Sequence, residues 1–319
     1  MGLDLATLNT DLGAYTRKYS NTIMAQVFQG IELEKYMTGV AKVTDEYVMG
    51  NATIGQVLQP FHSAWQPKGE VLITPMINKV RQMKVDFTLT DLDDLYRTYL
   101  AFMAEEGRER KDWPIVKYIV NEMLIPQMIE DMNTVSAKGV YSANGGVAGT
   151  AEATIGSVDG VLTKVTAAIA GGELTPIATG VITASNILDA VNAFVDGMPE
   201  KYNGKPMDIL VSQTLATWYG RAYKTEYGTA SNYTGNGESV DNIHTIDGSR
   251  MRIVGLNSFS GSQRMVATPK KNFLKLYDKV NYPSAFEIQA NRRDIDIFTD
   301  LKRGYGFGTW EWVFVNDQA

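Results

Sequence analysis

The chain has 319 residues, more than a single hydrophobic core usually serves, and its 44% hydrophobic and 21% charged residues are typical of a globular protein. The absence of cysteine excludes disulfides, thiolate metal sites and cysteine nucleophiles, and only His62 and His244 remain as imidazoles. The formal net charge of −6 is opposite to that of a nucleic-acid-binding module, and no apolar run approaches the ~18 residues of a membrane span, so we expect a soluble, unexported protein.

The first ninety residues predict an arm followed by a long hairpin. Residues 1–41 show a weak apolar spacing, which predicts short helical turns. Two strand-like segments, Lys42–Met49 and Glu70–Leu89, flank a stretch containing Gly, Gln and Pro. The return segment alternates apolar and polar residues, which predicts a ribbon with one apolar face. Because so long a two-stranded ribbon is only marginally stable alone, we expect it to lie on something else.

Two helices follow the hairpin. Thr90 and the acid three residues later resemble a capping box, and helical spacing continues to near Gly107. A longer helix is predicted from Trp113 to Lys138, with an apolar stripe along its length and a kink at Pro126. We expect this second helix to form a spine of the fold.

A Gly-, Ala-, Ser- and Thr-rich stretch after Tyr141 predicts a boundary, and a second α/β lobe follows it. The last segment, Phe286–Val315, is predicted to be sheet that returns to the first lobe. The elements expected between them are helices at Val161–Ala170, Ser185–Val195 and Gln213–Tyr227, and strands at Met207–Val211, Met251–Val254, Arg264–Ala267 and Phe273–Tyr277.

Motifs for catalysis or cofactor binding are missing from the sequence. No phosphate-binding GxxxxGK[ST], zinc-protease HExxH or hydrolase GxSxG pattern occurs. The segment Gly304–Gly308, GYGFG, lacks the strand–turn–helix context of a dinucleotide site, and its glycines indicate bends or close backbone approach. His62, in the distal hairpin, and His244, in a polar loop, have no second metal ligand at suitable spacing. We therefore predict no catalytic residue, cofactor or metal site.

Three groups of acidic residues allow alternatives. Two of them lie at helix ends, where helix-dipole contacts or a solvated face are more plausible than acid/base pairs. The third group could suggest a hard-cation site, but basic neighbours favour exposed strand charges or intersubunit ion pairs. The groups are Asp91, Asp93 and Asp94; Glu105, Glu106 and Glu109; and Asp294, Asp296 and Asp300, beside Arg292, Arg293, Lys302 and Arg303.

The distal hairpin carries aromatic residues with no helix nearby in the sequence to cover them. Phe61 and Trp65 stand among polar residues there. Either they pack on the same subunit or they contact a neighbouring one. We favour the neighbour, because aromatic anchors are typical of interface centres.

In this order of elements the chain resembles the major capsid proteins of tailed bacteriophages, which have the Hong Kong 97-like fold, an α+β fold that encapsulin shells share. Three passages carry the likeness: IEDMNTVSAKGVYSANGG, ILVSQTLATWYGRAY and VGLNSFSGSQRMVATPKKNFLKLYDK. The resemblance implies an N-terminal arm (1–41), an extended loop (42–90), a peripheral domain with the spine helix (91–140), an axial domain (141–265) and C-terminal strands returning to the peripheral domain (266–319).

The resemblance also implies a function. Such a subunit assembles into pentamers and hexamers of an icosahedral shell around double-stranded DNA, which it contacts weakly and without sequence specificity. Further partners implied are portal and scaffolding proteins and decoration proteins, with no membrane. Its place is the virion capsid, after synthesis in the host bacterial cytoplasm. The residues we expect at intersubunit contacts are Phe61, Trp65, Lys68, Arg292, Arg293 and Asp294.

Some properties of relatives are not carried over, and two rival functions remain. Certain relatives form a lysine–asparagine crosslink; Lys68 lies near the loop tip here, but no partner asparagine can be matched. Scaffold is expected to be a separate protein, or a segment removed before Met1. One rival is an encapsulin-like compartment that encloses a cargo enzyme. The other is a hydrolase that uses Asp/Glu pairs, which would need distant carboxylates brought together in a concave pocket.

Overall fold

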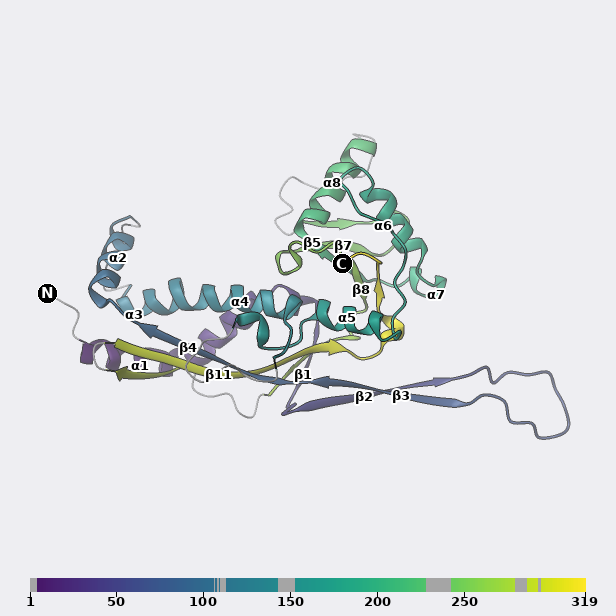
Figure 1. The fold of residues 1–319 in the computed structure, drawn as a ribbon, viewed down its shortest axis with the longest axis horizontal. Helices are drawn as coiled ribbons and strands as arrows, with labels where there is room; N and C mark the ends of the chain where they lie inside the picture. Colours follow the sequence, from purple (N-terminus) through teal and green to yellow (C-terminus); the bar gives the residue numbers. More distant parts are fainter. Residues whose placement is uncertain are drawn as a thin grey trace.

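The computed structural model describes residues 5–105, 107, 109, 113–142, 153–227, 242–278, 286–291 and 294–319. Figure 1 shows an elongated first lobe of long helices over a sheet, a second lobe standing on one end of it, and a two-stranded ribbon that projects away from both. This mixture of helices and sheets agrees with the predicted α+β class.

The N-terminal arm is one long helix, so the prediction of short helical turns was wrong. Helix α1 spans Leu5–Gly30 and buries Leu8, Leu12 and Val27. Thr16 occupies the same buried stripe, and its hydroxyl donates to the carbonyl of Leu12 at 2.9 Å. A buried hydroxyl satisfied by its own helix interrupts the apolar spacing without interrupting the helix. The short helix η1 (Leu33–Tyr36) follows.

The predicted hairpin is a ribbon whose return segment divides into two strands. Strands β2 (Glu46–Ile54) and β3 (Val71–Lys79) pair along their whole length. After Val80, strand β4 (Arg81–Leu89) leaves the ribbon and pairs with β11 (Asp294–Phe307) in the first lobe. The alternation of apolar and polar residues in Arg81–Leu89, which we assigned to the ribbon, therefore belongs to the sheet of the first lobe.

The spine runs continuously from residue 115 to residue 138. It comprises α3 (Ile115–Tyr118), a π-helical turn η2 (Ile119–Leu124) and α4 (Ile125–Lys138), and is preceded by α2 (Leu92–Glu105). The π turn replaces a simple kink at Pro126, which has no N–H and whose ring would crowd the carbonyl four residues earlier. The amide of Ile125 donates to Val120, five residues back.

The large sheet has β11 at its centre. One edge of β11 pairs with β4. The other edge pairs first with β10 (Glu287–Asn291) and then with β9 (Phe273–Tyr277). Strand β1 (Thr38–Ala41) pairs with β9 in parallel. Alternate residues of β11 are buried in the core shared with α1 and the spine. The predicted return of the C-terminal segment to the first lobe is thus made by β11.

The second lobe has its own five-stranded sheet and a core around Phe194 and Ile209. Residues 266–319 were expected to return to the first lobe, but β8 and β12 from this range pair within the sheet of the second lobe. Its elements are α6 (Ile187–Asp196), α7 (Glu200–Asn203), β5 (Asp208–Ser212), α8 (Gln213–Tyr227), β6 (Ile243–Thr245), β7 (Arg252–Leu256), β8 (Val266–Thr268) and β12 (Phe314–Val315). The remaining elements, η3 (Thr154–Gly156), α5 (Val161–Ala170), η5 (Asn257–Phe259) and η6 (Trp310–Trp312), contact the spine or the core of the first lobe.

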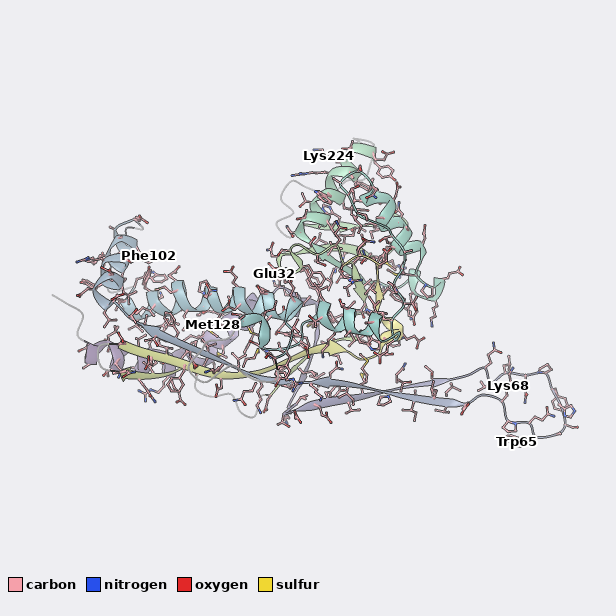
Figure 2. The ribbon with its side chains drawn as sticks, in the orientation of Figure 1. Glu32, Trp65, Lys68, Phe102, Met128 and Lys224 are labelled. Atoms are coloured by element: carbon pink, nitrogen blue, oxygen red, sulfur yellow. The ribbon has the colours of Figure 1, made fainter. Side chains whose placement is uncertain are left out.

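Polar contacts join the two lobes where the second lobe meets the spine. The carboxylate of Glu32, just after α1, accepts from the backbone amide of Asn257 at 2.9 Å and from its side chain at 2.8 Å (Figure 2). Lys138, at the end of the spine, donates to the carbonyl of Ser260. Phe259, which lies in the sequence between Asn257 and Ser260, is fully buried in the core of the first lobe. These contacts fix the second lobe against the spine.

Candidate assembly surfaces

The ribbon of β2 and β3 extends beyond the body of the protein. Figure 2 places Trp65 and Lys68 at its far end, away from both lobes. Two antiparallel strands with solvent on both sides are marginally stable in water. A surface of this kind is a candidate contact with another molecule, so the side chains on each face decide what it can do.

One face of the ribbon is apolar from Val48 to Ile54 on β2 and from Val71 to Ile77 on β3, and at the base the same face carries Glu46 opposite Lys79. Residues directly opposite each other in an antiparallel pair share a face, and the pairs on this face are Val48 with Ile77, Gly50 with Pro75, Ala52 with Ile73, and Ile54 with Val71. The five large side chains, Val48, Ile54, Val71, Ile73 and Ile77, are each 52–64% exposed. We call these residues the apolar face. A contiguous exposed surface of this composition is typical of interaction sites.

The opposite face rests on the body near its base. Tyr47 packs against the buried cluster around Val43 and Leu276, and Met76 packs against the main core. The side chain of Asn51 donates to the hydroxyl of Thr309 at 3.0 Å. Among the described residues, the contacts between the ribbon and the body are made by this face, and the large side chains of the apolar face remain exposed.

The loop between the strands, residues 55–70, exposes its aromatic side chains. Phe61 is 97% exposed and Trp65 is 91% exposed, so neither packs on its own subunit. The ammonium of Lys68 donates to the carbonyl of Leu58 at 3.1 Å, which helps to fold the loop back on itself. His62 is also exposed there, and its Nδ1 accepts from the amide of Ala64.

The base of the ribbon is polar, buried and closely packed against β11. Asn78 donates from Nδ2 to the carbonyl of Phe307 at 2.8 Å and accepts at Oδ1 from the ammonium of Lys164 at 3.4 Å. A Cβ on Gly306 would lie 1.8 Å from that Oδ1, and one on Gly304 would lie 2.5 Å from the carbonyl oxygen of Lys79. The predicted close backbone approach at these glycines is confirmed. Asn78 and Lys164 were missed, because an isolated polar residue gives no periodic signal.

The charged segment near the start of β11 is only partly described. Arg292 and Arg293 lie outside the described residues. Asp294 begins β11, is partly exposed and pairs in register with Asn291. Asp296 accepts from Thr88 at 2.8 Å. Both acids are partly exposed, and Asp296 also accepts from the side chain of Asn291 at 3.1 Å.

A buried ion cluster ties η1 to the large sheet. The carboxylate of Glu34, only 3% exposed, lies 3.1 Å from Lys275 and 3.5 Å from Arg303, and it accepts from the hydroxyl of Tyr305 at 3.2 Å. The guanidinium of Arg303 stacks on the ring of Phe28 at 3.7 Å. Burial, with Glu34 beside the phenol, raises the pKa of Tyr305. Glu34 and Arg303 are enclosed, and Lys275 reaches the cluster from a partly exposed position.

His244 does not lie in a polar loop, contrary to our prediction. It is in strand β6, half-buried against Tyr219, and its Nε2 lies 2.9 Å from Oδ1 of Asn242. Burial lowers its pKa. Its ring fills the space beside Gly220, where a Cβ would lie 2.7 Å from the imidazole. A packing role explains this histidine.

The described parts of the chain bring no set of three or more His, Asp or Glu side chains together as metal ligands. Within the same residues, no helix has both the length and the apolar character to cross a membrane. Glu105 ends α2, whereas Asp93 and Asp94 are in its first turn, so these acids lie at opposite ends of one helix.

No protein-family model matches the sequence, and a search of curated proteins finds no significant match. Solved structures do match. A chain of the satellite phage P4 procapsid including size determination (Sid) protein has a TM-score of 0.59 at 13% identity, covering 93% of this chain and 90% of that one. A chain of Gordonia phage Cozz has a TM-score of 0.53 at 8% identity, covering 90% of this chain and 85% of that one. A chain of the capsid of the native GTA particle has a TM-score of 0.52 at 10% identity, covering 90% of this chain and 89% of that one. The chain therefore has, over nearly its whole length, the fold of phage capsid subunits.

Proposed function

We propose that this chain is a major capsid protein, a coat subunit that assembles with copies of itself into the shell of a tailed bacteriophage. The observation that carries the proposal is the fold match, over 93% of the chain, to a phage procapsid chain. The proposed role is structural rather than enzymatic. Function follows from surfaces rather than from fold alone, and the uncovered apolar face of the ribbon is a surface that self-assembly would use.

In the proposed shell, pentamers and hexamers of the subunit form an icosahedral particle around double-stranded DNA. Residues 1–41 act as the arm, 42–90 as the extended loop, 91–140 as the peripheral domain and 141–265 as the axial domain around each capsomer axis. Within 266–319, β9–β11 serve the peripheral domain, whereas the pairing of β8 and β12 supports leaving these two strands with the axial domain. The net charge of −6 argues against tight binding of DNA, so the proposed contact with DNA is weak and non-specific.

The proposed intersubunit contact is the extended loop lying across a neighbouring copy. Burial of the apolar face would supply most of the energy, with Phe61 and Trp65 as anchors and Lys68 at the tip. Asp294, with Arg292 and Arg293 next to it in the sequence, would add ion pairs at the other end of the sheet. Proposed further partners are portal and scaffolding proteins and decoration proteins. The proposed location is the virion capsid, after synthesis in the bacterial host's cytoplasm.

The direct test is to express the chain alone and examine the soluble fraction by negative-stain electron microscopy. Closed shells, rings of five or six subunits, or sheets would support the proposal. A monomer that stays monomeric even with a candidate scaffold protein would refute it. Shells that enclose a protein cargo in place of DNA in infected or native cells would favour the encapsulin-like alternative.

Neighbouring residues on opposite faces of the ribbon give a matched pair of variants. Ile73 lies on the apolar face and Leu72 on the other, and both are 64% exposed. Ile73→Ser should reduce shell formation, because fully burying such a side chain contributes roughly 1.5–3 kcal/mol. Leu72→Ser should leave assembly near the parent level. Equal effects of the two variants would contradict docking through the apolar face.

The tip has its own test. Trp65→Ala should cost about 2 kcal/mol per contact if this side chain is an interface anchor, and Ser63→Ala in the same loop is the control. Both variants should unfold at the parent temperature, because both positions are exposed. Parent-level shell yield and shell stability for Trp65→Ala would remove the anchor role.

A further inference from the structure

The ribbon leaves the large sheet at a defined point. Pairing of β4 with β11 ends at Arg81 opposite Arg303. Val80 separates β4 from β3 and is 5% exposed, and its amide donates to the carbonyl of Asp45 at 2.6 Å. Beyond this point β11 continues for four more residues, paired on its other edge with β9. On the edge that β4 has left, the backbone of β11 needs other partners.

Two side chains supply those partners. The ammonium of Lys164, from α5, donates to the carbonyl of Tyr305, and the Nδ2 of Asn78, from β3, donates to the carbonyl of Phe307 at 2.8 Å. Lys164 also reaches the Oδ1 of Asn78 at 3.4 Å, so the two donors are linked. Asn78 is only 1% exposed. Side-chain donors thus replace the sheet ladder at the base of the ribbon.

The space around these donors does not tolerate rearrangement. Gly304 and Gly306 let β11 pass directly over β3, with the position of a Gly306 Cβ 1.8 Å from the Oδ1 of Asn78. Small angular changes at the base are amplified along the ribbon. Nine residues of strand reach about 30 Å at ~3.3 Å per residue, so a rotation of roughly 10° at the base moves the far end by about 5 Å. A docking surface displaced by that distance would miss its partner.

We propose that Asn78 and Lys164 form a clamp that ends the β4–β11 ladder and sets the direction in which the ribbon leaves the body. They are positioning residues: they act on assembly through the ribbon rather than through contact with another subunit. This inference rests on the proposed shell function for its consequence, but the clamp itself is a property of the single subunit. The two parts can therefore be tested separately.

The subunit part is tested by a distance measurement. The chain has no cysteine, so Thr53→Cys on the ribbon and Thr134→Cys on the spine place two spin labels at exposed sites. In the unassembled parent we expect one narrow distance distribution by pulsed electron paramagnetic resonance. Lys164→Met and Asn78→Leu should broaden or shift it while the far-ultraviolet circular dichroism stays unchanged.

Milder and control variants complete the design. Asn78→Asp keeps an oxygen toward Lys164 but cannot donate to Phe307, so it should broaden the distribution even if Asn78→Leu fails to fold. Lys84→Met and Asn291→Leu change exposed residues of the same sheet and should leave the distances unaltered. A narrow, unshifted distribution in the folded clamp variants would overturn the clamp.

The assembly part is tested with the same variants without labels. The clamp variants should raise the subunit concentration needed for shells by about tenfold, equal to about 1.4 kcal/mol per subunit. Broadened distances with shell formation at the parent concentration would overturn the link from ribbon direction to assembly. If the parent itself forms no shells, the proposed function fails, and the label distances still decide whether the clamp exists.

Discussion

Raising the pH from 7 to 9.5 should stabilise the folded subunit, and Lys164 is the reason. Its ammonium is enclosed at the base of the ribbon, and burial lowers its pKa from 10.5 to about 8, with Arg81 acting in the same direction and Asp159 opposing them. The unfolded chain therefore binds more protons than the folded chain between pH 8 and 10.5. Stability rises with pH across this window, and it falls as pH drops toward 8.

The size of the effect follows from the two pKa values. A difference of one pKa unit corresponds to about 1.4 kcal/mol, and the interval from pH 7 to 9.5 covers roughly the first 1.5 units of the difference, so the gain is up to about 2 kcal/mol. Tyrosines act in the opposite direction at higher pH. Burial raises the pKa of Tyr305 above its ordinary value, so ionisation of the unfolded chain destabilises the fold above pH 10. The measurement therefore stops at 9.5.

The measurement is the free energy of unfolding in urea of the unassembled subunit at several pH values, for the parent and for Lys164→Met. The variant lacks the titrating group but keeps every other one, so the difference between the two pH profiles isolates Lys164. We expect the parent to gain up to about 2 kcal/mol more than the variant over this range. Parallel profiles would show that the ammonium is not desolvated, and would refute the enclosed position at the ribbon base.

Three substitutions test the packing that holds the arm and the sheet. Gly306→Ala should cost about 2–3 kcal/mol of unfolding free energy, because the new methyl would meet Asn78 at 1.8 Å and neither strand can move aside; a neutral result by urea unfolding would disprove the close approach. Gly30→Ala gains up to about 1 kcal/mol in helix propensity but places a methyl 2.5 Å from Ile129, so a net loss of roughly 1 kcal/mol is expected, and Ile129→Val should restore it. Glu34→Gln leaves buried Arg303 without its counter-charge and should cost about 3 kcal/mol, whereas Glu32→Gln, at an exposed contact, should cost less than about 1.

Elements whose residues alternate in a regular way were predictable from the sequence. Helices α5 and α8 and strand β9 have the bounds expected from the pattern alone. Each carries a continuous apolar stripe or run with a clear break at both ends. The arm was misjudged because Thr16 and its polar neighbours dilute the stripe of α1, although the hydroxyl of Thr16 is satisfied within the helix.

The division of the return strand could not be predicted from periodicity. The apolar face of β3 uses odd-numbered positions, from Val71 to Ile77, and the buried face of β4 also uses odd-numbered positions, Met83 to Leu89. Since the parity does not change across Val80, the alternation is the same for one long strand and for two. Only the partner differs: β2 for the first part and β11 for the second. The local pattern of apolar and polar residues does not reveal which distant strand is the pairing partner.

The ribbon combines a rigid base with an unprotected face, and the two features have different causes. At the base, buried donors and acceptors must be satisfied, so Asn78 and Lys164 are held in one arrangement. Along the apolar face, the pairs from Val48–Ile77 to Ile54–Val71 bury little surface in the single subunit. A neighbour that covers this face would supply the energy that a lone two-stranded ribbon lacks. Ordering of the ribbon and association of subunits are then one coupled step, with the direction fixed in advance by the base.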